Sequence, residues 1–126
     1  MKASNDPRHQ RRRTVARQLF ALMFAPDQEV EEQVKGIWAK KEEIDNLITE
    51  HAPEWPLNKL NRTDLAILQL AVYELKIEKK EPIKVVIDEA VELAKEMGSE
   101  NSPAFINGVL GSIIKGDPRL EEKEVL

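Results

Sequence analysis

The stretch RTDLAILQLAVYELKI, residues 62–77, decides the fold class of this 126-residue chain. Apolar side chains occupy nearly every position between Leu65 and Leu75, so a helix over this stretch would be hydrophobic on almost all sides. Helices of that kind lie at the centre of a fold, covered by other elements. We therefore predict a buried central helix over residues 62–77.

The segments around this helix show the spacing of amphipathic helices. Apolar residues recur every three or four positions in residues 10–24, from about residue 30 to residue 51, in residues 85–97 and in residues 105–114. No alternating strand pattern occurs. The sequence predicts an all-α, compact single-domain bundle of about five to six helices over residues 10–116. Residues 1–9 are expected to be a flexible basic N-terminus, and residues 117–126 a charged, disordered tail.

Several residues predict where these helices begin, end and pack. Asp27 is expected to cap the second helix and Gly98 to close the fourth in a left-handed conformation. Ser102 followed by Pro103 is a typical helix start. Gly108 is expected to permit close approach of another helix. Trp55 lies in the irregular link between the second and third helices, and its large ring is expected to cover the core.

Charge is distributed unevenly along the chain. The first 18 residues carry a net charge of +5, whereas the whole chain carries −4, so the remainder carries −9. A basic tip on an acidic body concentrates positive potential at one site. Phosphate backbones bind to such sites, and nucleic acid is therefore the first partner to consider.

Composition excludes several other functions. The chain has no cysteine and only two histidines, His9 and His51, and it contains no glycine-rich phosphate loop or metal-ligand pattern. We expect no enzymatic activity, no cofactor and no metal. A signal peptide and an apolar stretch of about 18 residues are also missing, which predicts a cytoplasmic protein without a membrane segment.

Three stretches resemble the NusB family of transcription antitermination factors. They are RRRTVARQLF at residues 11–20, LAILQLAVYEL at 65–75 continuing into VIDEAVELAK at 86–95, and SPAFINGVL at 102–110. The resemblance implies an all-helical RNA-binding factor that pairs with the ribosomal protein NusE and recognises the single-stranded boxA element. It also implies a place in the RNA polymerase antitermination complex, notably in ribosomal RNA operons.

The chain departs from the family pattern at three places. The connection between the first helix and Val30 is shorter than usual, Gln69 stands where many relatives have an arginine, and Gly111 stands where an acidic residue is common. These differences are expected to bear on the affinity for RNA or partner. A helical adaptor that binds only protein therefore remains an alternative function, and self-association into a homodimer is also possible.

The arginine-rich start provides the candidate RNA contacts. Arginine binds phosphate through a planar fork and stacks on exposed bases, and the resemblance adds aromatic and polar positions to this set. Each has an alternative role, as a solvated helix start, a core ring or a helix cap. The candidates are Arg8, Arg11, Arg12, Arg13, Arg17, Phe20, Asn101, Ser102 and Phe105.

An acidic and aromatic set is the candidate protein-binding site. A basic ribosomal protein would be attracted to such a surface. The alternative is that the acidic residues only solubilise the helices and that the tyrosine is a core residue. The candidates are Tyr73, Glu74, Asp88, Glu89 and Glu92.

Overall fold

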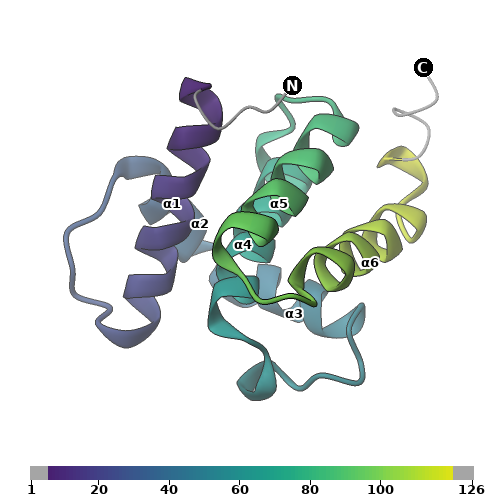
Figure 1. Ribbon diagram of the computed structural model, residues 1–126, viewed down its shortest axis with the longest axis horizontal. Helices are drawn as coiled ribbons and strands as arrows, with labels where there is room; N and C mark the ends of the chain where they lie inside the picture. Colours follow the sequence, from purple (N-terminus) through teal and green to yellow (C-terminus); the bar gives the residue numbers. More distant parts are fainter. Residues whose placement is uncertain (1–5, 121–126) are drawn as a thin grey trace.

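The computed structural model describes residues 6–120 and is all-helical, with no strand in that range. Figure 1 shows a compact bundle, which confirms the predicted fold class. A short 3-10 helix, Leu57–Lys59, precedes α4, and a π-helical turn, Glu74–Glu78, extends it. The α-helices are α1 (Pro7–Phe24), α2 (Glu32–Ala39), α3 (Lys41–Glu50), α4 (Arg62–Tyr73), α5 (Ile83–Met97) and α6 (Ser102–Lys115).

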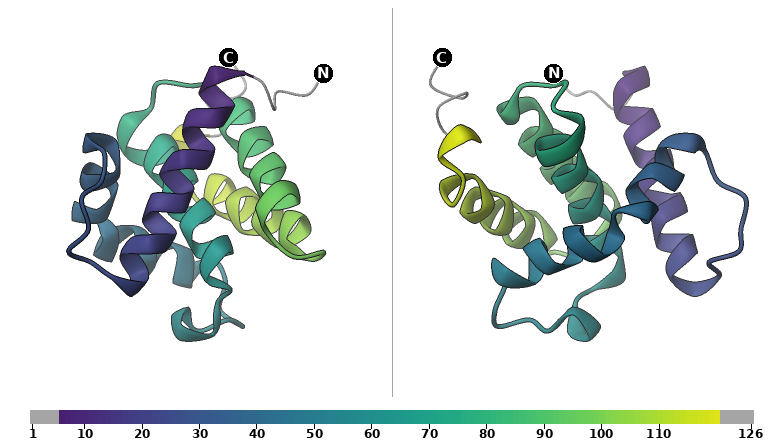
Figure 2. Two further views of the ribbon diagram at one scale, coloured as in Figure 1. Left: turned by 60° about the vertical axis from the view of Figure 1, so that its left-hand side comes forward. Right: turned by 180° about the vertical axis from the view of Figure 1, so that it is seen from behind.

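The central helix is α4, as its sequence predicts. Every residue from Asp64 to Val72 is buried, and α4 packs against each of the other five α-helices. Figure 2 shows α1 crossing one side of α4, while α5 and α6 pack against each other. Because its neighbours cover α4 from several directions, only a nearly all-apolar helix is stable there.

The prediction of one long helix from about residue 30 to residue 51 is wrong. The structure has two helices instead, α2 and α3, separated at Lys40, whose φ and ψ are −101° and 13°. The start of α2 at Glu32 also means that Asp27 does not cap it. The turn at Lys40 lets α2 pack on α1 while α3 packs on α4, so tertiary packing sets the break.

The junctions before α5 and α6 also differ from expectation. Gly98 is extended, with φ −95° and ψ −166°, and is not left-handed. The left-handed residue is Lys79, with φ 57°, whose N–H donates to the carbonyl of Glu74 at 2.8 Å. Ser102 is the first residue of α6, and its buried hydroxyl oxygen accepts a hydrogen bond from the backbone N–H of Ser99 at 2.9 Å.

Both ends of the described chain are more ordered than the sequence predicts. Helix α1 begins at Pro7, three residues early, because the Asp6 carboxylate caps it by accepting from the N–H of Arg8 at 2.8 Å. At the other end, Asp117 and Leu120 are buried. The predictions of a flexible start and a disordered tail are therefore wrong for residues 6–9 and 117–120. Their remaining parts, residues 1–5 and 121–126, lie outside the described residues.

Two residues near the C-terminal end of α4 hold other helices. Lys76 donates to the Asp117 carboxylate at 2.6 Å, which attaches the segment after α6 to the π-helical turn. Gln69 is buried and donates to Asp45 of α3 at 2.9 Å. Gln69 therefore joins two helices of the bundle and presents no surface to a partner. Within residues 6–120, no helix is both long enough and apolar enough to cross a membrane.

Candidate nucleic-acid interface

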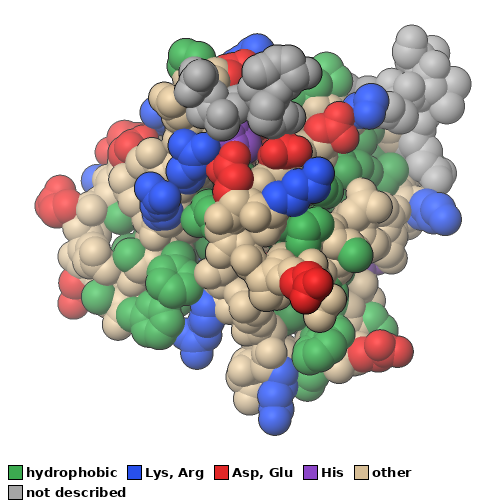
Figure 3. All heavy atoms as spheres, viewed as in Figure 1, with side chains coloured by type: hydrophobic (Ala, Val, Ile, Leu, Met, Phe, Trp, Pro, Cys, Tyr) green, Lys and Arg blue, Asp and Glu red, His purple; other side chains and the backbone are tan. Residues whose placement is uncertain are grey.

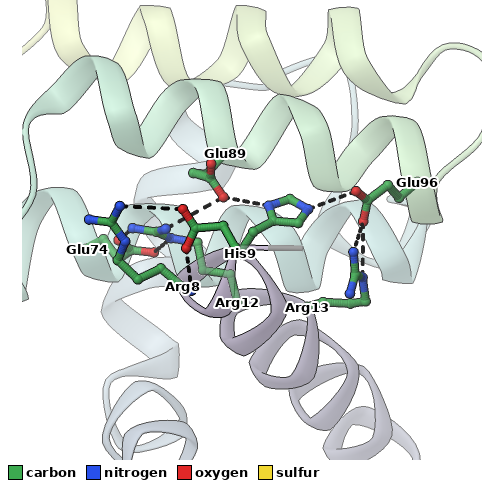
Figure 4. A network of polar contacts seen from close by, with 8 residues as sticks. Arg8, His9, Arg12, Arg13, Glu74, Glu89 and Glu96 are labelled. Carbon is green, nitrogen blue, oxygen red and sulfur yellow. Dashed lines mark hydrogen bonds and ion pairs between the residues drawn. The ribbon is translucent and has the colours of Figure 1, made fainter. Parts of the chain in front are cut away.

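The basic start of α1 is fixed by carboxylates from α5 and from the turn after α4. Arg12 donates to both oxygens of Glu74 at 2.8 Å, and Arg13 donates to Glu96 at 2.9 and 3.1 Å. Between them, His9 is fully buried. Its Nδ1 lies 2.5 Å from Glu89 and its Nε2 lies 2.8 Å from Glu96. Figure 4 shows these side chains as one network, which we call the α1–α5 charge network.

The network changes the ionisation of its members. The hydrogen bond to Glu74 raises the pKa of Arg12, against an opposing effect of burial. Burial by itself would raise the pKa of Glu96, but hydrogen bonds from His9 and Arg13 outweigh it and lower that pKa. Arg12 and Arg13 are both paired with carboxylates. The network ties α1 to α4 and α5.

This arrangement brings together two sets of residues that the sequence assigned to different sites. Arg12 and Arg13 were RNA candidates, whereas Glu74 and Glu89 were candidates for the protein partner. Side-chain exposure is only 12% for Arg12 and 6% for Glu74. These residues mainly hold the bundle together, and little of them faces solvent.

Three arginines of α1 do face solvent. Arg8 is 73% exposed and pairs with Asp6 at 3.5 Å, and Arg11 is 58% exposed and pairs with Glu31 at 3.3 Å. Arg17 is exposed and makes no ion pair with any of residues 6–120. Figure 3 shows basic side chains beside acidic ones near the start of α1. The available positive charge of this helix therefore lies on Arg8, Arg11 and Arg17.

An open cavity of about 440 Å³ lies beside the loop between α5 and α6. The Trp55 and Phe105 rings meet edge to face there, with centroids 6.3 Å apart, and Asn101 adds an exposed amide. Trp55 is 49% exposed, so the expectation that its ring covers the core is wrong. The cavity is lined by Trp55, Lys59, Leu60, Asn61, Asp64, Ser99, Asn101 and Phe105.

The same cavity reaches a buried carboxylate. Asp64 is only 6% exposed, and its Oδ1 has no hydrogen-bond partner. Burial raises the pKa of Asp64, and a hydrogen bond with Ser102 opposes that rise. Ser102 is 1% exposed. Its hydroxyl is therefore occupied inside the fold, which leaves Asn101 and Phe105 as the accessible candidates that line this cavity.

The C-terminal end of α1 carries aromatic rings on its surface. Phe20 is half-buried, and its centroid lies 5.1 Å from that of Phe24, which is 63% exposed. The sequence placed Phe24 on the buried stripe of the helix, which is wrong because the chain turns away at Ala25 and leaves the last turn uncovered.

The candidate protein-binding residues do not form one surface. Asp88, Glu89 and Glu92 line a groove of about 460 Å³ between α5 and α6. Glu74 is buried against Arg12, and Tyr73 is partly buried, with its hydroxyl next to Gly36 of α2. The groove therefore keeps three of the five candidates, and Glu89 is shared with the α1–α5 charge network.

The fold and this surface define a small all-α protein built around one buried helix, with an arginine-bearing first helix on its outside. The sequence model of the NusB family matches residues 18–115. The chain belongs to the NusB family.

Individual relatives agree with this assignment. A transcription antitermination protein NusB from Chloroflexus aggregans is 51% identical over 83 residues, covering 64% of this chain and 55% of the relative. The corresponding protein of a Roseiflexus species is 42% identical over 110 residues, covering 84% and 78%. The solved structure of T. maritima NusB superposes with a TM-score of 0.82 at 36% identity, covering 95% of this chain and 98% of that one.

The aligned region is a limited part of some relatives. This chain spans 55% of the length of the Chloroflexus aggregans protein and 62% of that from Clostridium novyi, which is 49% identical over 82 residues. The activity and partners of the whole relatives are therefore treated below as a proposal.

Proposed function

We propose that this chain is an RNA-binding transcription antitermination factor. In this proposal it pairs with the ribosomal protein NusE, binds a boxA-like single strand and supports antitermination by RNA polymerase in ribosomal RNA operons, in the cytoplasm. The observation that carries the proposal is the outward, incompletely paired charge of Arg8, Arg11 and Arg17 on α1 of a NusB-family fold.

The chemistry of this surface suits a single strand. Exposed arginines bind phosphates through two N–H groups, and their positive charge attracts the backbone irrespective of sequence. The Trp55–Phe105 cavity adds aromatic edges and an amide, which are the groups that recognise unstacked bases. Arg13 pairs with Glu96, three residues before Ser99 of the cavity wall, so the arginine helix and the cavity adjoin through the end of α5.

The partner site in this proposal is the groove between α5 and α6. Asp88 and Glu92 give it an acidic rim, which would attract a basic protein such as NusE. Glu74 and Glu89 were candidates for the same role, but Arg12 and His9 already occupy their carboxylates. Asp88 and Glu92 also form ion pairs, but with exposed lysines of their own helix, Lys84 and Lys95, at 3.2 and 3.5 Å. In this proposal NusE docks on Asp88 and Glu92, at the rim of the groove.

The test measures the affinity for a boxA-like strand and for a scrambled strand, with and without NusE, at several salt concentrations. We expect the boxA-like strand to bind preferentially and NusE to tighten it. The triple variant Arg8→Ala, Arg11→Ala, Arg17→Ala should weaken RNA binding and make the salt slope shallower by about two units, because each phosphate contact on a single strand contributes about 0.7.

A matched control separates this effect from a general loss of charge. Lys115→Ala removes one exposed cation from the last turn of α6, and we expect it to leave the affinity unchanged. An unchanged affinity in the folded triple variant would overturn the RNA assignment. In that case, binding of NusE without any RNA would favour the adaptor function.

A further inference from the structure

An aromatic side chain and an arginine from different helices form an exposed stack at one end of the molecule. Phe24, the last residue of α1, is 63% exposed, although large apolar side chains are normally buried. Arg62, the first residue of α4, places its guanidinium carbon 5.1 Å from the centre of the Phe24 ring. The centroid of the Phe20 ring lies 5.1 Å from that of Phe24, at an interplanar angle of 56°.

The position of this stack continues the surface of the exposed arginines. Arg17, Phe20 and Phe24 are spaced three and four residues apart, so they lie along one face of α1. Seven residues of helix span about 10 Å, which keeps Arg17 and Phe24 within reach of one short strand. Figure 3 shows hydrophobic side chains gathered over this end of α1.

The charge of Arg62 indicates which kind of molecule binds there. No carboxylate of residues 6–120 forms an ion pair with Arg62, and its position in the first turn of α4 adds to the positive end of that helix. An apolar protein surface docked on Phe24 would bury this charge without a partner. A nucleic acid satisfies both groups, because a base stacks on the ring or guanidinium plane while a phosphate neutralises the charge.

We propose that Phe24 and Arg62 form a stacking platform for an unpaired base of single-stranded RNA, adjacent to the segment held by the α1 arginines. This inference rests on the proposed RNA-binding function and adds a second, sequence-tolerant contact to it. The platform lengthens the bound strand towards the start of α4.

The experiment compares a boxA-like strand with the same strand extended by four nucleotides at its 5′ or its 3′ end. A 2-aminopurine in the extension reports stacking by fluorescence quenching. In the wild-type protein, one of the two extensions should tighten binding by about five-fold or more and quench the probe. Phe24→Ala should abolish that gain and leave the affinity for the short strand unchanged.

Conservative variants separate stacking from other roles. Phe24→Leu keeps apolar bulk without a π face, and Arg62→Lys keeps the charge without a planar group, so both should lose the gain as Phe24→Ala does. Val85→Ala removes exposed apolar surface from α5, where Val85 is 36% exposed, and should retain the gain. Full binding of the extended strand by Phe24→Leu would overturn the platform.

The remaining outcomes distinguish this proposal from the function on which it rests. A preference for the boxA-like strand without any gain from either extension overturns the platform alone. If the extension raises the affinity but the boxA-like strand binds no better than a scrambled strand, the platform is supported and boxA recognition is overturned. If Phe24→Ala changes the association state in sedimentation while the gain is absent, the patch is an interface between copies. If the wild-type protein binds neither strand, both proposals are overturned.

Discussion

Arg12 and Glu74 are joined by two hydrogen bonds of 2.8 Å, across 62 positions of the sequence. Nε and Nη2 of the guanidinium each donate to a separate carboxylate oxygen, which is the two-point geometry of a strong ion pair. The pair fixes the first helix to the end of the central one. Arg12 therefore contributes to the stability of the bundle, and loss of function in an Arg12 variant would not by itself identify an RNA contact.

Glu74→Ala should destabilise the fold strongly. Among residues 6–120, the change leaves the largely buried guanidinium of Arg12 with only Glu89, 3.6 Å away, as an ionic partner. Removing one member of a buried pair costs about 3–5 kcal/mol of unfolding free energy, and the remaining contact favours the lower end. Urea denaturation measures this. Arg17→Ala serves as the exposed control and should shift the unfolding free energy by less than about 0.5 kcal/mol.

His9→Leu should loosen the start of α1. The substitution keeps apolar volume but removes the contacts from both ring nitrogens to Glu89 and Glu96 of α5. Leaving these two carboxylates without their histidine partner lowers the free energy of unfolding by about 1–3 kcal/mol. Hydrogen exchange should show faster exchange in residues 10–16, while amides in the middle of α4 change only with global stability. Equal protection of α1 in variant and wild type would contradict this role.

Asp64→Asn should stabilise the protein at neutral pH. Burial raises the pKa of Asp64 above its ordinary 3.8, so the folded state retains the proton more tightly than the unfolded state. Stability therefore falls as the pH rises through the range above 3.8. The neutral amide avoids this loss, and we expect a gain of about 1 kcal/mol at pH 7 and none at pH 3. An equal gain at both pH values would show that the charge is not the cause.

Asp117→Asn should have the opposite pH dependence. Hydrogen bonds from Arg119 and then Lys76 hold the pKa of Asp117 far below its ordinary 3.8. The stability that ionised Asp117 gives to the folded state is therefore complete above pH 3.8, and it is lost as the pH falls towards the lowered pKa. The variant should be less stable by about 1 kcal/mol at pH 7, with a smaller difference in acid. Thermal unfolding at several pH values measures both.

Gly98→Ala should disturb the junction of α5 and α6. A Cβ at this position would lie 2.5 Å from the Ser102 hydroxyl oxygen and 2.9 Å from the backbone carbonyl of Ala94. Such overpacking lowers the free energy of unfolding by about 1–3 kcal/mol.

Gly108→Ala is the matched control within α6. No atom lies within 4 Å of its added Cβ, so the expected close approach of another helix is wrong there. The control should gain up to about 1 kcal/mol from helix propensity. Similar melting shifts in the two variants would refute the steric explanation.

The helices themselves were predictable because their apolar spacing is a local property. The buried stretch around Ile67 and the stripes of α1, α5 and α6 were recognised from the sequence alone. The break at Lys40 was not, because Ile37 and Ile44 fit one continuous stripe and no proline or glycine marks the turn. Packing of α2 and α3 on different neighbours decides it.

The charge network was missed for a related reason. The sequence shows where charges are but not which distant helix faces them, so Arg12 was considered for RNA and Glu74 for a protein partner. A signal was nevertheless present. His9, Arg12 and Arg13 share a helical face, and Glu89 and Glu96 are two turns apart on another helix. Two matching faces of opposite charge would have indicated a contact between α1 and α5.

The α1–α5 charge network joins parts of the chain that are synthesised at different times. During synthesis, α1 precedes every carboxylate that the network supplies to it, at positions 74, 89 and 96. The helix that carries the arginines is thus made long before its counter-charges exist. Its contacts with Glu89 and Glu96 can form only after α5 has been made, so the last third of the polypeptide supplies most of the charges that hold the first helix.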